Sequence, residues 1–185
     1  MLNLLPETYL SGLIVLLVII SILVGRQLIR VRNDEISLIK LDRKNIANSD
    51  NVSEMYELAA VQIRKRLYPQ AISTLKKAVK LLDKEPPEAI AIIQNALGFS
   101  LAAQDDFKSA ITHYKIALKA KPNYPVGLNN LAFAKQKLYK YEEALEIYKK
   151  VLSIDKGNRT AEKQLRKIEL RNLSPSQNKL KDRGF

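Results

Sequence analysis

The chain has 185 residues, a formal net charge of +12 and no cysteine. This length accommodates one domain of about 100–150 residues with appended segments. The lack of cysteine excludes a disulfide framework and a thiolate metal site, which favours a non-secreted protein. The positive charge suits contact with anionic lipid, acidic proteins or nucleic acid, although the solvated surface of an ordinary helical protein explains it more simply.

Residues 1–28 are predicted to form a transmembrane anchor. Residues 8–25 carry no charge, and a helix over them would cover about 27 Å, close to the thickness of a bilayer core. A cleaved signal peptide is the alternative, but its positively charged start and its A-x-A-like cleavage site are missing. Because Arg26 and Arg30 follow the run whereas only Glu7 precedes it, the positive-inside rule places the rest of the chain on the cytoplasmic-type side.

Residues 29–51 are expected to form a basic stalk or linker. Apolar residues recur in it at approximately helical spacing among charges, at Val31, Leu38, Ile39 and Ile46. One interpretation is that the anchor helix continues beyond the membrane as a semi-rigid stalk that ends before Asn48. The other is an amphipathic segment that lies on the lipid surface. Both interpretations fit the pattern.

One pattern of apolar and small residues occurs three times after the stalk. Each copy has a leucine followed by a small residue, then an aromatic, an alanine and a further leucine or tyrosine. The copies are Leu58, Ala59, Tyr68, Ala71 and Leu75; Leu97, Gly98, Phe107, Ala110 and Tyr114; and Leu131, Ala132, Tyr141, Ala144 and Tyr148. A period of about 34 residues, built as helix, turn and helix, resembles the tetratricopeptide repeat (TPR), whose units bury their apolar faces by stacking on neighbours.

The predicted fold is therefore all-α, with the transmembrane helix, an α-solenoid of three TPR units and a carboxyl-terminal capping helix. The units are placed at residues 52–85, 86–124 and 125–158, the second opened by a Pro-Pro loop, with the capping helix at 159–171 and a flexible basic tail at 172–185. Small residues such as Gly98 let the two helices of a unit approach closely. Asn51 is expected to cap the first unit, and Pro125 to open the third.

No constellation for catalysis is found, so an enzyme is not expected. The single histidine, His113, has no metal partner at ligand spacing and is predicted to be an outward polar residue. The six glycines are scattered, so no phosphate-binding loop is present. Neither a cofactor nor a metal is predicted. Nucleic-acid binding is not expected, because the surface lysines lack the interleaved aromatics on which bases stack.

The concave groove of the array is the predicted protein-binding site. Counted from Val52, Ala91 and Pro125, positions two, five, nine and twelve of each first helix point inward. The residues assigned to the groove are Tyr56, Ile63, Ile92, Asn95, Phe99, Asn129, Phe133 and Gln136. Phe99 and Phe133 are expected to anchor a partner while Asn95 and Asn129 pair with its backbone, since aromatics dominate interface energetics. The alternative is that the stalk fills the groove or that these residues pack between units.

The string from Leu97 to Pro122 matches the TPR consensus, and this resemblance extends from Val52 to about Ile168. TPR proteins that bind the acidic ends of heat-shock chaperones use a clamp of lysine, asparagine and arginine across three units. That clamp is mostly missing here, so binding of a chaperone tail is not expected.

The whole architecture resembles one TPR family in particular. A single anchor, a basic stalk, three repeats and a composition rich in Lys, Ile and Asn are similar to the plastid and cyanobacterial family that assists photosystem I assembly. The resemblance implies a thylakoid membrane protein with its repeats in the stroma or cytosol. It also implies a non-catalytic assembly or stability factor whose partners are subunits of photosystem I. The alternative is a general membrane-anchored adaptor for another envelope or secretion complex.

Overall fold

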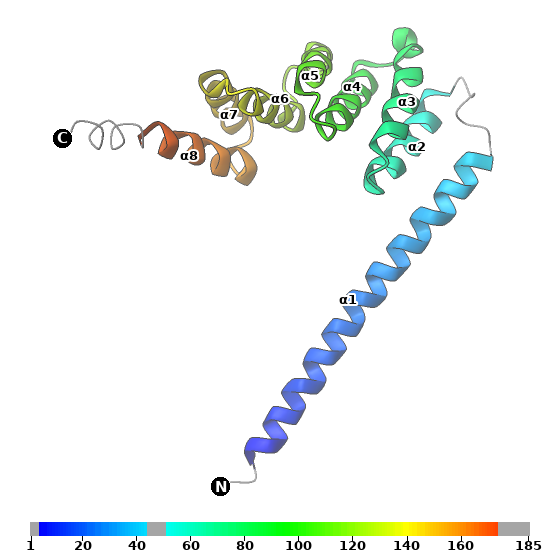
Figure 1. Cartoon of the computed structure of the whole chain (residues 1–185), viewed down its shortest axis with the longest axis vertical. Coiled ribbons are helices and arrows are strands. Elements are labelled where there is room, and N and C mark those ends of the chain that lie inside the picture. The colour runs from blue at the N-terminus through cyan, green and yellow to red at the C-terminus, as the bar shows by residue number, and fades with distance from the viewer. Residues whose placement is uncertain (1–3, 44–50, 174–185) are drawn as a thin grey trace, which may run out of the picture. The chain divides into compact units, whose positions relative to one another are not determined.

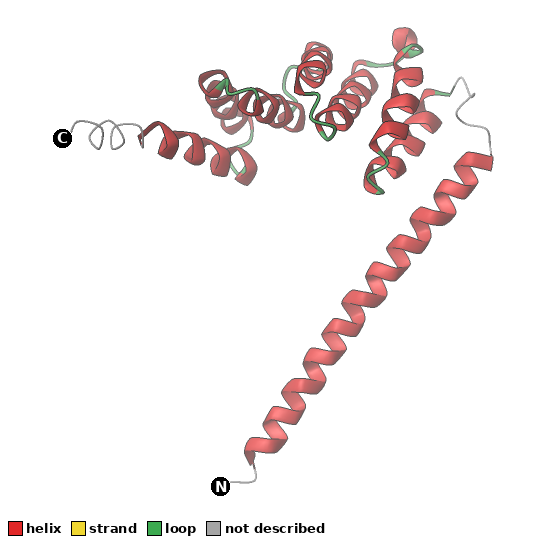
Figure 2. Ribbon diagram, viewed as in Figure 1, coloured by secondary structure: helices red, strands yellow, loops and turns green. Residues whose placement is uncertain are grey.

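The computed structural model describes residues 4–43 and 51–173, and all regular elements within them are helical (Figures 1 and 2). The elements are α1 (Leu4–Arg43), α2 (Val52–Arg64), α3 (Tyr68–Val79), the short 3-10 helix η2 (Leu82–Lys84), α4 (Pro87–Ala102), α5 (Phe107–Ala120), α6 (Pro125–Lys137), α7 (Tyr141–Ile154) and α8 (Arg159–Leu173). The predicted all-α class is confirmed. Of the predicted tail, residues 174–185 lie outside the described residues. The chain divides into two units, residues 1–45 and 46–185, and each is described by itself.

Helix α1 contains the predicted anchor. Its segment Tyr9–Ile29 has a mean hydropathy of 2.5 and is long and apolar enough to cross a membrane. The large apolar side chains of this segment are exposed, which suits a helix whose surroundings are lipid. The helix continues without a break from the predicted anchor into the predicted stalk as far as Arg43, in agreement with a stalk that extends the anchor helix. The last part of that stalk, residues 44–50, lies outside the described residues.

The second unit consists of three helix pairs, α2 with α3, α4 with α5 and α6 with α7, followed by the single helix α8 (Figure 1). The first helices of the three pairs begin at Val52, Pro87 and Pro125. Asn51 caps α2, because its Oδ1 accepts hydrogen bonds from the backbone N–H groups of Ser53 and Glu54 at 3.0 and 3.2 Å. Pro87 and Pro125 are the first residues of α4 and α6, a position where no helical hydrogen bond requires the missing N–H.

Small residues bring the two helices of each pair into contact. The buried residues at the crossings are Ala59, Gly98 and Ala132 on the first helices and Ala71, Ala110 and Ala144 on the second. One turn further along each second helix, Leu75, Tyr114 and Tyr148 are almost completely buried. This arrangement repeats along the array, so each pair depends on its neighbours to cover its apolar faces.

The same backbone turn joins the two helices of every pair. Arg66, Asp105 and Tyr139 have φ angles of 60°, 60° and 61°, which lie in the left-handed region. In the third pair, Tyr139 donates its N–H to the carbonyl of Gln136 and Lys140 donates to that of Lys135, both at 3.0 Å. Equivalent bonds occur in the other two turns, so each first helix ends in a Schellman motif. The repeated geometry directs each second helix back along the first.

Candidate protein-binding groove

The eight residues predicted for the groove lie on the first helices of the three pairs. Helix α2 carries Tyr56 and Ile63, α4 carries Ile92, Asn95 and Phe99, and α6 carries Asn129, Phe133 and Gln136. Asn95 is buried, whereas the others keep part of their surface exposed. The two phenylalanines are each 41% exposed, a high value for an aromatic side chain.

The exposed phenylalanines also pack between units. The ring of Phe99 meets Tyr68 edge to face at a centroid distance of 6.5 Å, and Phe133 meets Phe107 in the same way at 6.5 Å. Tyr68 and Phe107 are the first residues of α3 and α5, so each contact joins one unit to the next. Such pairs contribute about 0.5–1.5 kcal/mol beyond their buried area. One edge of each phenylalanine therefore supports the array while the other surface remains open.

The two groove asparagines take part in hydrogen bonds within the array. Nδ2 of Asn130 donates to Oδ1 of Asn95 at 2.9 Å and links α6 to α4. Nδ2 of Asn129 donates at 3.0 Å to Oδ1 of Asn158, which also accepts from the backbone N–H of Ala161 at the start of α8. The side-chain oxygen of Asn95 and the side-chain nitrogen of Asn129 therefore already form hydrogen bonds within the array. The pairing of Asn95 and Asn129 with a partner's backbone stays a prediction.

Two pockets contain four of the eight predicted groove residues. The first has a volume of about 210 Å³ and contains Tyr56 and Ile92, together with Val52, Ala89 and Ile93. Its walls are mainly apolar, which suits the insertion of a single side chain.

The second pocket has a volume of about 350 Å³ and lies where α6 and α7 meet α8. It contains Phe133 and Gln136 from the predicted groove. The other lining residues, which sequence reasoning did not assign to a site, are Lys137, Tyr139, Tyr141, Gln164, Lys167, Ile168 and Arg171. Helix α8 was interpreted only as a cap, and the turn residues only as connections. In the sequence, the cluster of aromatic and basic residues after Gln136 is the pattern that indicates this site.

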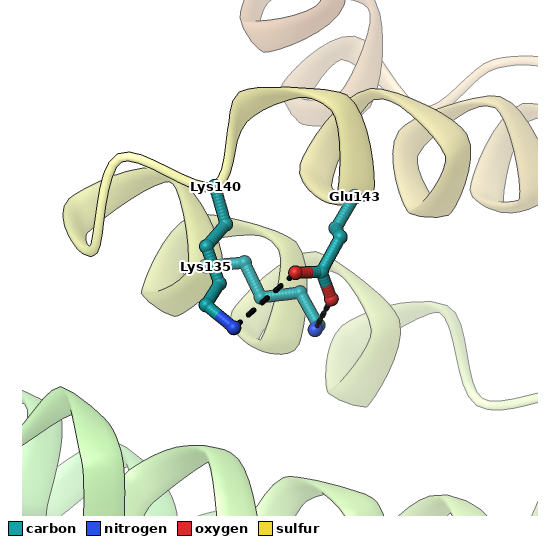
Figure 3. A network of polar contacts seen from close by, with 3 residues as sticks. All are labelled: Lys135, Lys140 and Glu143. Carbon is teal, nitrogen blue, oxygen red and sulfur yellow. Dashed lines mark hydrogen bonds and ion pairs between the residues drawn. The ribbon is translucent and has the colours of Figure 1, made fainter.

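Lys135, which precedes this pocket on α6, is paired with an acid instead of facing a ligand. Its side chain is only 10% exposed and its Nζ donates to Oε2 of Glu143 on α7. Lys140 contacts the other carboxylate oxygen of Glu143 at 3.3 Å (Figure 3). The hydrogen bonds from Lys135 and then Lys140 hold the pKa of Glu143 below its usual value. This network links α6 to α7 in the third helix pair.

The structure corrects the prediction for His113, which was expected to point outward. The ring is half-buried between helices, and its Nδ1 donates to Oε1 of Gln94 on α4 over 2.7 Å. Burial, followed by the nearby positive charge of Lys76, lowers the pKa of His113 below its usual value. The histidine therefore links α5 to α4. Its polar environment comes from Gln94, nineteen positions earlier, which helical spacing on one element does not reveal.

The three packed helix pairs define the class of this protein, which is a TPR protein. The sequence profile of the tetratricopeptide repeat matches residues 127–154. The first TPR of Spaghetti (RPAP3), solved with an HSP90 peptide, superposes with a TM-score of 0.61 over 69% of this chain and 97% of that structure. The two sequences are 22% identical, so the likeness concerns the fold.

Whole-chain similarity identifies the family. The chain is 30% identical over 162 residues to ycf37 of Guillardia theta, covering 88% of this chain and 91% of that protein. It is also 30% identical over 154 residues to PYG7, a chloroplastic TPR domain-containing protein of Arabidopsis thaliana, covering 83% of this chain and 51% of that one. The chain belongs to the ycf37 family of TPR proteins.

Proposed function

We propose that this protein is a non-catalytic, membrane-anchored TPR scaffold that assists the assembly or stability of photosystem I. The observation that carries the proposal is the strip along α2, α4 and α6, on which Phe99 and Phe133 remain 41% exposed although each is fixed by an aromatic neighbour. Rigid aromatic side chains with an open face are typical anchors for a protein partner. The strip holds a subunit while the rest of the complex forms.

The apolar segment of α1 supports a location in the membrane. Tyr9–Ile29 is long enough to span a bilayer. Arg26 lies in its last turn, and Arg30 and Arg32 follow it. The arginines keep the TPR unit on the stromal or cytoplasmic side of a single-pass thylakoid protein. The chloroplastic location of the PYG7 relative agrees with this assignment.

Photosystem I is proposed as the client on the basis of the family resemblance. The order of anchor, basic stalk, repeats and basic tail is similar to that of the TPR family that assists photosystem I assembly. A scaffold anchored in the same membrane as its client diffuses with it in the plane of that membrane. This raises the effective concentration of the client, so each contact between them can be weaker.

The test is affinity purification of the full chain, tagged at its carboxyl end, from detergent-solubilised thylakoid membranes. Photosystem I subunits are expected among the co-purifying chains, and the protein is expected to stay in the pellet when membranes are washed with alkaline carbonate. Release by carbonate would contradict the anchor. Recovery of a different membrane complex in place of photosystem I would support the general adaptor instead.

A further inference from the structure

The pocket between α6, α7 and α8 is positively charged. Of its lining residues, Lys137, Lys167 and Arg171 are basic, and none is acidic. Within the part of the chain that the structure describes, no ion pair involves these three side chains. The same helices do pair other charges: Lys135 and Lys140 share Glu143. The pocket is therefore a place where positive charge is left without an internal partner.

Aromatic rings hold two of these cations. The guanidinium of Arg171 lies 4.0 Å from the ring centroid of Tyr141, and Nζ of Lys137 lies 5.5 Å from the centroid of Phe133. A cation over a ring face is attracted by the ring, but its N–H donors are not consumed by carboxylate oxygens. The stacked guanidinium in particular keeps its donors along its edge for a planar anion. The aromatics position the charges and leave them available.

We propose that this pocket binds an acidic segment of the client protein, with carboxylates on Lys137, Lys167 and Arg171 and an apolar side chain against Phe133. Charge complementarity selects acidic residues, because three uncompensated cations line one cavity. The exposed ring of Phe133 gives a peptide side chain an apolar contact that a simple anion cannot use. A volume of about 350 Å³ is near the lower end for ligand pockets, which suits one or two side chains of a longer segment. The inference rests on the proposed function, since it names what the scaffold recognises.

The experiment measures fluorescence anisotropy with the full chain in detergent micelles. The probe is a fluorescein-labelled, amidated peptide of sequence GSDFEDLG, and its matched control is GSNFQNLG, in which amides replace the acids. The acidic peptide is expected to bind at least about tenfold more tightly than the amide peptide, because charge-assisted hydrogen bonds are roughly twice as strong as neutral ones. Equal affinity of the two peptides would overturn the proposal.

Two substitutions on α8 give a matched comparison. Lys167→Gln removes a pocket charge for which the described residues provide no aromatic or acidic partner. Lys163→Gln removes an exposed charge of the same helix outside the pocket. Lys167→Gln is expected to weaken acidic-peptide binding about threefold to tenfold, while Lys163→Gln changes it less than about twofold. The double variant Lys137→Gln with Arg171→Gln is expected to bind the acidic peptide more than about tenfold more weakly than the wild type. Equal losses at Lys167 and Lys163 would mean unspecific attraction and would overturn the pocket.

Competition identifies the chemical source of the anion. Unlabelled acidic peptide is expected to displace the probe, whereas inorganic phosphate and glycerol phosphate at the same concentration are not. Displacement by these phosphates as effective as that by the peptide would assign the pocket to small anions or lipid headgroups instead. The result is separable from the proposed function: failure of peptide binding with photosystem I still co-purifying overturns only the pocket. Peptide binding without any photosystem I subunit in the purification overturns only the client.

Discussion

Gly98 of α4 lies against the ring of Tyr114 of α5, so closely that a Cβ at this glycine would be 2.6 Å from Cε1 of the tyrosine. The same Cβ would be 3.1 Å from the carbonyl oxygen of Ala110, which belongs to the backbone and cannot rotate away. The central helix pair therefore depends on the absence of a side chain at one position.

Replacing Gly98 by alanine is expected to destabilise the TPR unit. The added methyl forces α4 and α5 apart, and overpacking of this kind costs about 1–3 kcal/mol. Thermal unfolding followed by circular dichroism measures the loss. Gly157→Ala is the matched control, because the nearest atom to its added Cβ is 3.8 Å away, and it should change stability by less than about 0.5 kcal/mol. Similar melting temperatures for the two variants would contradict the assigned crossing.

Stability of the TPR unit is expected to fall in mild acid because of His113. Burial holds its folded-state pKa below the usual 6.5, so the unfolded chain takes up the proton first as the pH decreases. The contribution is therefore complete above pH 6.5 and is lost as the pH falls through the lower folded-state pKa. Melting temperatures measured between about pH 8 and 5 should show this loss. Because the chain has one histidine, His113→Gln should flatten that part of the profile, and an unchanged profile would exclude His113 as its source.

Because Arg66 has a left-handed backbone conformation, glycine at this position is expected to give a more stable protein than alanine. At φ 60° glycine carries no Cβ penalty, so Arg66→Gly should be more stable than Arg66→Ala by about 1 kcal/mol. At the exposed Ser73 inside α3 the order should reverse, with alanine better than glycine by about 0.5–1 kcal/mol. Chemical denaturation of the four variants measures both differences. Alanine as stable as glycine at Arg66 would contradict the left-handed conformation.

Loss of the Glu143 carboxylate should be felt more strongly than loss of the neighbouring Glu146. Glu143→Gln removes the negative partner of Lys135, whose side chain is 10% exposed and poorly placed to regain water. Glu146 pairs only with Lys149, whose side chain is 54% exposed, so Glu146→Gln should be nearly neutral. Melting temperatures should rank wild type and Glu146→Gln together above Glu143→Gln. The reverse ranking would show that the buried lysine does not need its acid.

Client binding should depend on the two open phenylalanines. Phe99→Ala combined with Phe133→Ala is expected to abolish co-purification of the client, because desolvated aromatic anchors carry binding energy that screened surface charges do not. Lys76, Lys77 and Lys80 are exposed on α3 and at its carboxyl end. Replacing them by glutamine should mainly change the salt dependence and the association rate of client binding.

The phenylalanine comparison requires the double variant to remain folded, since each ring also stacks on the preceding unit. A cooperative thermal melt establishes this, and Phe99→Leu with Phe133→Leu, which retains more of the apolar contact, serves as a second variant. A folded double-alanine variant that recovers its client at wild-type yield would remove the groove from the mechanism.

The helices and their order could be predicted because their causes are local. Asn51 caps α2 through hydrogen bonds to residues two and three positions away, and Pro125 begins α6 because of its own ring. The crossings were predictable for a related reason: a small residue repeated at one period marks the same contact in every unit. The continuous apolar run likewise predicts α1, since a helix satisfies its own backbone.

The site depended on contacts that local patterns do not encode. Positions counted from Val52, Ala91 and Pro125 identify an inward direction. They do not show that Phe99 meets Tyr68 or that Asn130 bonds to Asn95, thirty-five positions away. For His113 the same limit produced a wrong prediction. Gln94, which holds the half-buried ring of His113 between helices, lies on a different helix.

By itself, the sequence determined the class of fold, the apolar helix and the repeat period, because these follow from composition and from spacing within single helices. Tertiary structure alone decided which charges are neutralised. Lys135 and Lys137 are two positions apart on α6, yet one is paired with Glu143 and the other lies over Phe133 beside an acid-free pocket. Residues two apart on a helix face different neighbours. Glu143 comes from α7 and most of the pocket from α7 and α8, whereas Phe133 belongs to α6 itself.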